Sequence, residues 1–389
     1  MIYSFDEIVD RRNNNSAKLE EAYLHYGTND VIPLWIADMD FKTAQPIIDA
    51  IHRRADQGIF GYTSRPEEYF QCIATWQQER NGYLPDPEWM AFAPGVIPAM
   101  RILLNLFTEP GDKIIVQYPV YHPFTDIVVN SGRTLVVNPL RQAHGTYVMD
   151  YADLEQKAKA GAKYLFLCNP HNPVGRCWSR EELKRAGDIC VKYGVEVISD
   201  EVHSDLMLFG HKHTVFASVS EEIAGITTTC IAPSKTFNLA GLQSATVIFH
   251  DREQKEIYEA LLKKMDIARN NCFSLVATME AYRSGGEWLG QLLDYLEQNM
   301  LFIHDYCKTY IPALKPNLPE CTYLCWIDAR ELGMTDAELL RFMVEKAGVG
   351  LGMGAEFGHG GEGFLRMNAA CPRSTLKTAL EQIRKSLES

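Results

Sequence analysis

Short apolar runs alternate with longer stretches of helical periodicity between about residue 90 and residue 250. The apolar runs span residues 113–117, 134–137, 163–167, 195–199, 227–231 and 245–249. Such an alternation is typical of a parallel sheet whose strands are joined by helical crossovers. The sequence therefore predicts an α/β fold built on a mostly parallel sheet.

One crossover helix is marked at both ends. Ser179 and Glu182 have the spacing of a capping box, and the apolar positions that follow keep a helical period until Gly194. Farther along, the periodicity of residues 251–310 predicts a long amphipathic helix.

The pattern changes in the last quarter of the chain. Prolines between residues 312 and 319 break the helical period, and residues 318–328 are strand-like. A helix capped at Thr335, a strand over residues 364–369 and a final helix from about Pro372 follow. This mixture predicts a smaller C-terminal α+β domain.

The composition favours a small-molecule ligand over a nucleic acid or a membrane. The chain has 389 residues, of which 46% are hydrophobic, and its formal net charge is -12 at pH 7. An acidic chain without clustered Lys and Arg is a poor partner for a phosphate backbone. No stretch approaches the roughly 18 apolar residues of a membrane span, and the N-terminal residues are polar rather than signal-like. We therefore expect a cytoplasmic protein.

The 10 cysteines are scattered without the paired short spacings of a disulfide framework or a metal site. Cys321 and Cys325 come closest to a ligand pair, but no second pair completes a tetrahedral set. Reduced thiols and no bound metal are therefore expected.

Two ionisable residues at the ends of apolar runs carry the main functional prediction. Lys235 follows the run 227–231, where burial would lower its pKa and expose a neutral amine that can hold an aldehyde as a Schiff base. Asp200 ends the run 195–199, where a carboxylate would keep a pyridine nitrogen protonated and make the ring an electron sink. Together they predict a pyridoxal 5′-phosphate site.

Three further segments would complete such a site. The backbone N–H groups of residues 95–97, at the start of a helical run, would face a phosphate, although glycine and proline before a helix are also ordinary start signals. Tyr121 follows a strand end and would either stack on a planar ring or serve as an interior aromatic. Asn172, in the turn Asn-Pro-His-Asn-Pro, has an amide suited to a phenolate oxygen.

His203 and Arg366 each have a functional and a structural interpretation. His203 would contact Asp200 or the ring oxygen, or it would be a buried histidine with a local partner. The planar guanidinium of Arg366 suits a bidentate grip on an amino-acid carboxylate, or a structural salt bridge. Glycines between residues 358 and 363 formally match a dinucleotide fingerprint, but a strand-like segment follows them, so we expect a loop beside Arg366.

From residue 30 to the C-terminus, these segments resemble the fold-type-I pyridoxal phosphate enzymes of the class I and II aminotransferase superfamily. The segments most similar to the MalY/PatB-type cystathionine β-lyases are residues 34–41, 61–62, 199–203, 232–238 and 366–368. The resemblance implies a large domain with a mostly parallel seven-stranded sheet and helices on both faces, a smaller α+β domain, and a homodimer with shared active sites. It also implies the division 1–45 (a segment packing with the small domain), 46–284 (the large cofactor-binding domain) and 285–389 (the small domain).

The resemblance implies a role for each candidate residue. The implied catalytic residues are Lys235, which would form the Schiff base, Asp200, which would pair with the pyridine nitrogen, and Tyr121, which would stack on the ring. The implied cofactor-binding residues are Gly95, Val96, Ile97, Tyr121, Asn172, Asp200, His203, Ser234, Lys235 and, from the other subunit, Tyr62. The implied substrate-binding residues are Arg366, Trp35, Asp38 and Tyr62.

One departure from the superfamily favours a particular reaction. Gln243 stands eight residues after the lysine, where many aminotransferases of the superfamily carry an arginine that neutralises the phosphate, and the MalY/PatB-type enzymes also lack that arginine. The resemblance thus implies a carbon–sulfur β-lyase that cleaves cystathionine or related S-substituted L-cysteines to a thiol, pyruvate and ammonia. An aminotransferase is the alternative, because the fold alone does not choose between the two reactions. A regulatory binding protein that retains the fold is a third interpretation.

Overall fold

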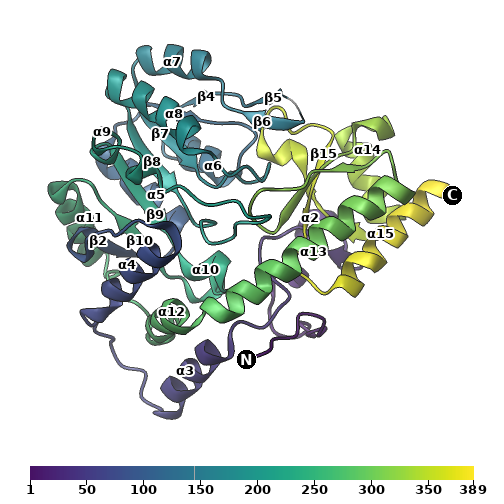
Figure 1. The fold of residues 1–389 in the computed structure, drawn as a ribbon, viewed down its shortest axis with the longest axis horizontal. Coiled ribbons are helices and arrows are strands. Elements are labelled where there is room, and N and C mark those ends of the chain that lie inside the picture. Colours follow the sequence, from purple (N-terminus) through teal and green to yellow (C-terminus); the bar gives the residue numbers. More distant parts are fainter. Residues whose placement is uncertain (144) are drawn as a thin grey trace.

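The computed structural model describes residues 1–143 and 145–389. A seven-stranded sheet with the strand order β2-β10-β9-β8-β7-β3-β4 forms the centre of the larger part of the molecule (Figure 1). Its strands are β2 (Met90–Ala93), β3 (Lys113–Val116), β4 (Thr134–Val137), β7 (Ala162–Cys168), β8 (Glu196–Asp200), β9 (Thr227–Ile231) and β10 (Ala245–Ile248). In this sheet β10 runs against its neighbours β2 and β9, and the pairs among β9, β8, β7, β3 and β4 are parallel. The predicted mostly parallel sheet is confirmed.

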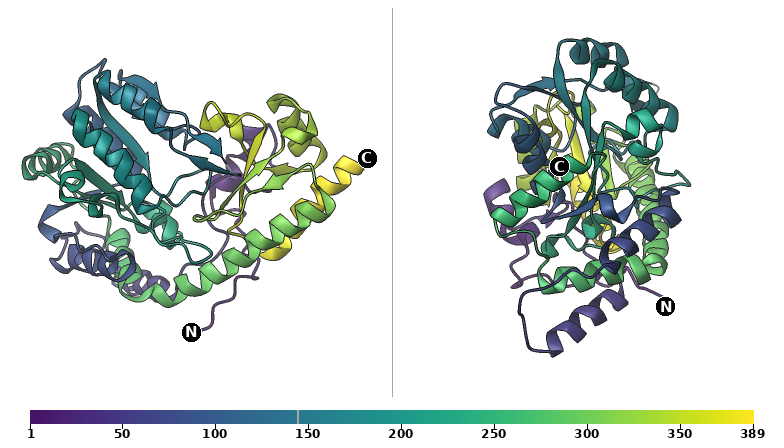
Figure 2. Two further views of the ribbon diagram at one scale, coloured as in Figure 1. Left: turned by 45° about the horizontal axis from the view of Figure 1, so that its top comes forward. Right: turned by 90° about the vertical axis from the view of Figure 1, so that its left-hand side faces the viewer.

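Helices cover both faces of this sheet (Figure 2). Neighbouring strand residues point to opposite faces. On β8, Val197 belongs to a core cluster with Leu183, whereas Ile198 belongs to a different cluster with Met100. The helices of this part are α3 (Gln45–Asp56), α4 (Glu68–Asn81), α5 (Val96–Phe107), α6 (Pro123–Asn130), α7 (Tyr151–Lys159), α8 (Arg180–Tyr193), α9 (Glu221–Ala224), α10 (Pro233–Thr236), α11 (Arg252–Lys264) and α12 (Cys272–Ser284).

The predicted crossover helix is α8, and its capping box is present. The Ser179 hydroxyl accepts a hydrogen bond from the Glu182 N–H at 3.2 Å, and the Glu182 carboxylate accepts one from the Ser179 N–H at 2.9 Å. The helix ends at Gly194, which has a φ of 65°. A residue with a side chain would be strained in that left-handed conformation.

The prediction of one long helix over residues 251–310 is wrong, because the segment forms α11, α12 and α13 (Gly286–Tyr310). After α11, Asp266 has a φ of 56°, which a helix does not accommodate. Asn271 then caps α12 by accepting hydrogen bonds from the N–H groups of Phe273 and Ser274. The helical spacing of apolar residues continues across these interruptions, so periodicity alone does not reveal them.

The smaller part of the molecule contains an antiparallel sheet with the order β11-β12-β15-β14. Helix α14 is capped at Thr335 as predicted, and its last turns widen into a π-helix over Phe342–Lys346. The predicted α+β composition of this part is confirmed. Its elements are β11 (Lys315–Pro316), β12 (Leu324–Asp328), α14 (Asp336–Arg341), β14 (Gly352–Met353), β15 (Phe364–Asn368) and α15 (Arg373–Glu388).

The N-terminal segment and α13 connect the two parts. Strand β1 (Ile32–Pro33) pairs in parallel with β13 (Val349–Gly350), while α3 packs against α12. Helix α13 runs from the larger part to the smaller one (Figure 1). The remaining elements are α1 (Ala17–Glu20), α2 (Ala22–Tyr26) and the hairpin of β5 (Arg141–Ala143) and β6 (Thr146–Val148). Among the described residues, every helix is too short or too polar to cross a membrane.

Candidate active site

A cavity of about 200 Å³ lies at the carboxyl ends of the parallel strands β7, β8 and β9. Open α/β sheets bind their ligands at this edge, because the strands end there and the loops that follow carry the polar side chains. The cavity is lined by Ala37, Gly95, Val96, Ile97, Pro98, Tyr121, Cys168, Asn172, Asp200, Val202, His203, Ser234 and Lys235. The structure thus places most of the predicted cofactor-binding residues around one space.

Lys235 and Asp200 reach the cavity from neighbouring strand ends, and burial displaces both of their pKa values. Asp200 is the last residue of β8, and Lys235 lies on the short helix that follows β9. Burial lowers the pKa of Lys235 to about 8 and raises the pKa of Asp200 to about 7. The Lys235 amine donates a hydrogen bond to the Ala37 carbonyl at 2.7 Å, and Asp200 accepts one from the Val202 N–H at 3.0 Å. Near neutral pH this site therefore offers both a nucleophilic amine and a carboxylate.

Helix α5 presents its N-terminus to the same space. It begins at Val96 with Gly95 as its N-cap, so the first backbone N–H groups of the helix have no partners within it. Gly95, Val96 and Ile97 all line the cavity, and Ser234 adds a hydroxyl. Such a helix end attracts a phosphate through its N–H groups and its dipole.

Tyr121 and Asn172 belong to two turns that are bonded to each other. The Tyr121 N–H donates to the Asn172 carbonyl at 3.1 Å, and the His171 ring nitrogen Nε2 lies 2.8 Å from the Pro119 carbonyl. Burial raises the pKa of the Tyr121 hydroxyl, which keeps this aromatic ring neutral. These bonds fix the position of the Tyr121 ring relative to the Asn172 amide.

Arg366, on β15, is 6% exposed and reaches this site from the smaller sheet. It donates from Nη1 to the Asn172 side-chain oxygen at 3.2 Å and from Nη2 to the Trp35 carbonyl at 2.7 Å. Its Nε is buried and has no hydrogen-bond partner among the described residues. These bonds are all to neutral oxygens, so the guanidinium charge is available to an anion.

His203 is 4% exposed, and burial lowers its pKa to about 3. Its ring stands edge-on to the Tyr323 ring, with the ring centres 6.1 Å apart. Within the described part of the chain, its Nδ1 atom is buried without a hydrogen-bond partner. A buried unpaired nitrogen in the cavity wall is the feature expected where a ligand supplies the missing partner.

The residues present fit pyridoxal 5′-phosphate. The aldehyde of this cofactor needs an amine, and its pyridine nitrogen needs a carboxylate. Its phenolate oxygen needs a neutral donor, and its phosphate needs an anion site. The cavity wall contains all four. The unpaired Nδ1 of His203, which lines this cavity, gives independent support, because it has no partner among the described residues.

All four residues expected at the substrate lie outside the cavity lining. Arg366 is connected to it by the hydrogen bond to the Asn172 side chain. Trp35 contacts Arg366 through its backbone carbonyl. The Asp38 carboxylate is held by the Arg11 guanidinium at 2.6 and 3.1 Å, so it fastens the N-terminal segment instead of facing the cavity. Tyr62 is fully exposed and borders a separate hollow of about 670 Å³ with Arg65.

The contacts of one backbone segment at the site were not predicted; its residue Ala37 lines the cavity and accepts the hydrogen bond from Lys235. This segment, residues 36–41, is called the strap below. Asn238 accepts a hydrogen bond from the Met39 N–H and donates to the Met39 and Phe41 carbonyls. Asn368 donates to the Ile36 and Asp38 carbonyls. Both asparagines lie within three residues of a predicted site residue, and that closeness is the signal by which they could have been found.

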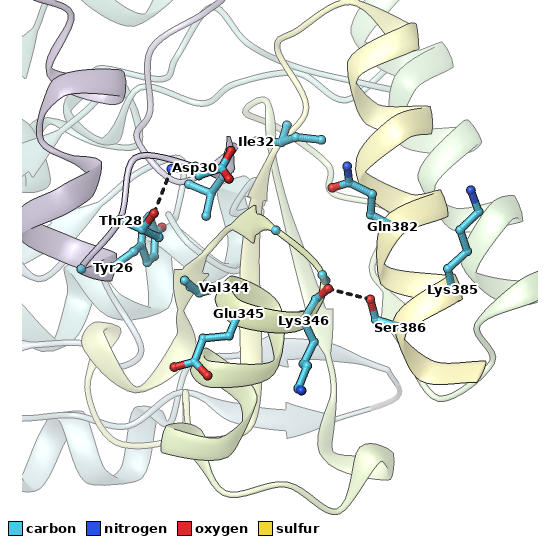
Figure 3. A pocket seen from close by; sticks show the side chains of 14 residues that line it. Tyr26, Thr28, Asp30, Ile32, Val344, Glu345, Lys346, Gln382, Lys385 and Ser386 are labelled. Atoms are coloured by element: carbon cyan, nitrogen blue, oxygen red, sulfur yellow. Dashed lines mark hydrogen bonds between the residues drawn. The ribbon is translucent and has the colours of Figure 1, made fainter. Parts of the chain in front are cut away.

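A larger hollow of about 870 Å³ lies between the N-terminal segment and the C-terminal helix α15 (Figure 3). Asp30, Glu345, Lys346 and Lys385 are among the residues that line it. None of the predicted site residues borders it, and its wall is open and largely polar. Its size therefore does not make it the reactive site.

Comparisons with known proteins show the family to which this chain belongs. The cystathionine β-lyase PatB of Bacillus subtilis (strain 168) is 43% identical over 99% of this chain and 100% of its own. A pyridoxal-phosphate-bound crystal structure from Clostridium difficile 630, provisionally named an aminotransferase, has a TM-score of 0.98 and 48% identity over 99% of this chain and 100% of that one. The pyridoxal-phosphate-bound C–S lyase of Staphylococcus hominis has a TM-score of 0.92 and 31% identity over 100% of this chain and 99% of that one. Residues 29–383 also match the family described as aminotransferase class I and II, so the chain belongs to that family.

Proposed function

We propose that this protein is a pyridoxal 5′-phosphate-dependent carbon–sulfur β-lyase that cleaves cystathionine or related S-substituted L-cysteines to a thiol, pyruvate and ammonia. The observation that carries the proposal is the pair formed by the Lys235 amine and the Asp200 carboxylate in one buried cavity. The likeness to PatB and to the C–S lyase of Staphylococcus hominis favours β-elimination over transamination.

Three side chains of the cavity wall have roles in this reaction. When bound, the cofactor supplies a ring that accepts the electrons of a carbanion at the substrate Cα. Lys235, with its pKa near 8, holds a sizeable neutral fraction near neutral pH and removes the Cα proton as a general base. Asp200 would hold a proton on the ring nitrogen, and Tyr121 would stack on the ring. The thiolate on Cβ then leaves with the bonding electrons.

The substrate-binding role belongs to Arg366 in this proposal. Its unpaired Nε and its Nη groups would hold the α-carboxylate, which fixes the Cα–H bond near Lys235. Trp35 supports this grip from the backbone, because its carbonyl holds Nη2 in place.

The protein works as a homodimer in this proposal, with Tyr62 of each subunit reaching the phosphate site of the other. Tyr62 is fully exposed, and the neighbouring Ile59 and Phe60 are 74% and 60% exposed, an unusual group of apolar side chains for a surface loop.

We further propose that the chain divides into residues 1–45, 46–284 and 285–389, as the sequence implies. Ten unpaired cysteines, nine of them buried, support a reducing, cytoplasmic location.

Product analysis separates the lyase from an aminotransferase. The purified holoenzyme is incubated with L-cystathionine in the absence of any 2-oxo acid, and pyruvate and ammonia are measured over time. A lyase regenerates its cofactor in every cycle, so we expect steady release over many turnovers. A single half-turnover that resumes only when a 2-oxo acid is added would establish the aminotransferase instead. Stable partner binding without any release would favour the regulatory interpretation.

Changing Arg366 to Lys is expected to raise the KM for L-cystathionine by about 10- to 100-fold, the range that the loss of a charge-assisted hydrogen bond predicts. An ammonium group cannot reproduce the planar fork that grips a carboxylate. Arg141→Lys is the matched control, because Arg141 is a largely exposed arginine on the hairpin. Equal KM values for the Arg366→Lys variant and the control would contradict the assigned role.

A further inference from the structure

Two sets of contacts connect the Arg366 guanidinium to Glu356, one through Phe357 and one through Trp35 and His25. The Arg366 guanidinium lies 4.7 Å above the Phe357 ring, and Glu356 directly precedes Phe357 in the chain. The Phe357 carbonyl accepts a hydrogen bond from the Val120 N–H at 2.9 Å, which joins this segment to the loop that carries Tyr121. Glu356 therefore lies on a segment that contacts Arg366 through Phe357 and is bonded to the loop that carries Tyr121.

His25 completes this group from the N-terminal segment. Its ring stacks on the Trp35 ring with the centres 4.7 Å apart, and its Nε2 lies 3.1 Å from Oε1 of Glu356. The Trp35 carbonyl binds Arg366, so a continuous set of contacts connects Glu356 to the buried guanidinium. The side chains of His25 and Glu356 are 29% and 39% exposed, so both can be reached from solvent.

The charges around Glu356 favour the binding of a cationic ligand group at its carboxylate. Burial lowers the pKa of Arg366, and Tyr121 and then Glu356 act in the opposite direction, which shows that the Glu356 charge reaches the guanidinium. Oε1 of Glu356 contacts His25, whereas Oε2 has no partner among the described residues. Arg366 would bind the α-carboxylate of a ligand, and the free oxygen of Glu356 would bind an ammonium group farther along the same ligand. The two residues together are therefore complementary to a ligand that carries both groups.

We propose that Glu356 is a specificity-determining residue that recognises the distal ammonium group of L-cystathionine-like substrates. This inference rests on the proposed function, because it takes the α-carboxylate of the cysteine half to lie on Arg366. The leaving group then extends outward past Tyr121 and Phe357, and its amino group meets the free oxygen of Glu356. Substrates whose leaving group carries no cation gain nothing from this residue.

Three substrates isolate this contact. L-Cystathionine carries both distal charges, S-(3-carboxypropyl)-L-cysteine is the same molecule without the distal amino group, and S-ethyl-L-cysteine carries neither charge. Pyruvate release by the holoenzyme gives kcat/KM for each. In Glu356→Gln we expect kcat/KM for L-cystathionine to fall by about three- to fivefold, the size of a partly exposed charge pair. The value for S-ethyl-L-cysteine should be unchanged, and the value for S-(3-carboxypropyl)-L-cysteine should not fall, because its distal carboxylate is repelled by Glu356. In Glu356→Lys we expect the preference between the first two substrates to reverse.

The matched control is Glu155→Gln, because the Glu155 side chain is 42% exposed and forms one ion pair, with Lys192 on α8. The control should leave all three kcat/KM values unchanged. A Glu356→Gln variant that lowers the three values equally, or lowers none, overturns the specificity role, since a purely structural contact would not distinguish the leaving groups. Failure of the proposed function gives a different result, because the unmodified holoenzyme would then release no pyruvate steadily from any of the three.

Discussion

Pyruvate release is expected to fall by at least about 10⁴-fold when Lys235 is replaced by alanine, the upper range for the loss of one general base. The amine is the group in the cavity that combines nucleophilicity with a pKa near neutrality, and alanine keeps the backbone but removes the nitrogen. The visible absorbance that reports the covalent attachment of the cofactor to the protein should disappear as well. Turnover with S-ethyl-L-cysteine and an absorption spectrum of the dialysed protein measure the two effects.

Lys192→Ala is the control for this experiment, because Lys192 is an exposed lysine whose ion pair with Glu155 lies on outer helices of the larger part. It should retain both the absorbance and the turnover. If Lys235→Ala kept both properties as well, the amine would not be the attachment point, and the proposed chemistry would have to be abandoned.

Asp200→Asn is expected to lower kcat/KM by about 10²- to 10³-fold, the usual effect of removing one preorganised electrostatic group. Asparagine retains the size of the side chain and an oxygen that accepts the hydrogen bond from the Val202 N–H. It carries no negative charge, so it cannot keep the ring nitrogen protonated. The absorbance of the attached cofactor should persist, because Lys235 is unchanged.

Asp188→Asn is the corresponding control, since Asp188 is half-exposed and pairs with Lys184 on α8. It should have no measurable effect on turnover. Asp200→Glu restores a carboxylate and should recover part of the lost activity. Full activity in Asp200→Asn would mean that the charge has no role, and that the buried carboxylate serves only the fold.

The sequence was informative where a strand is buried on both faces. Strands β7, β8 and β9 lie inside the sheet, so they appear as continuous apolar runs, and the residues that follow them necessarily meet at one edge. Strand β2 was not among the predicted runs, because Met-Ala-Phe-Ala has only one residue with a strong preference for strands. The junctions between α11, α12 and α13 were missed because they depend on local backbone conformation and capping.

The site was predictable in its strand-end residues and unpredictable in its backbone contacts. Asp200 and Lys235 stand next to recognisable apolar runs. The Ala37 carbonyl, by contrast, meets Lys235 across 198 positions of the chain, and no side-chain pattern marks a carbonyl that accepts a hydrogen bond. The engagement of Asp38 by Arg11 was equally hidden, since any aspartate near a substrate motif looks available until its partner is seen.

The strap has a consequence for how precisely a substrate is held. Asn238 follows Lys235 by three positions, and Asn368 follows Arg366 by two. Both asparagines form hydrogen bonds with backbone groups of the strap. One short stretch of backbone therefore holds Lys235, which removes the proton, at a set distance from Arg366, which binds the substrate carboxylate.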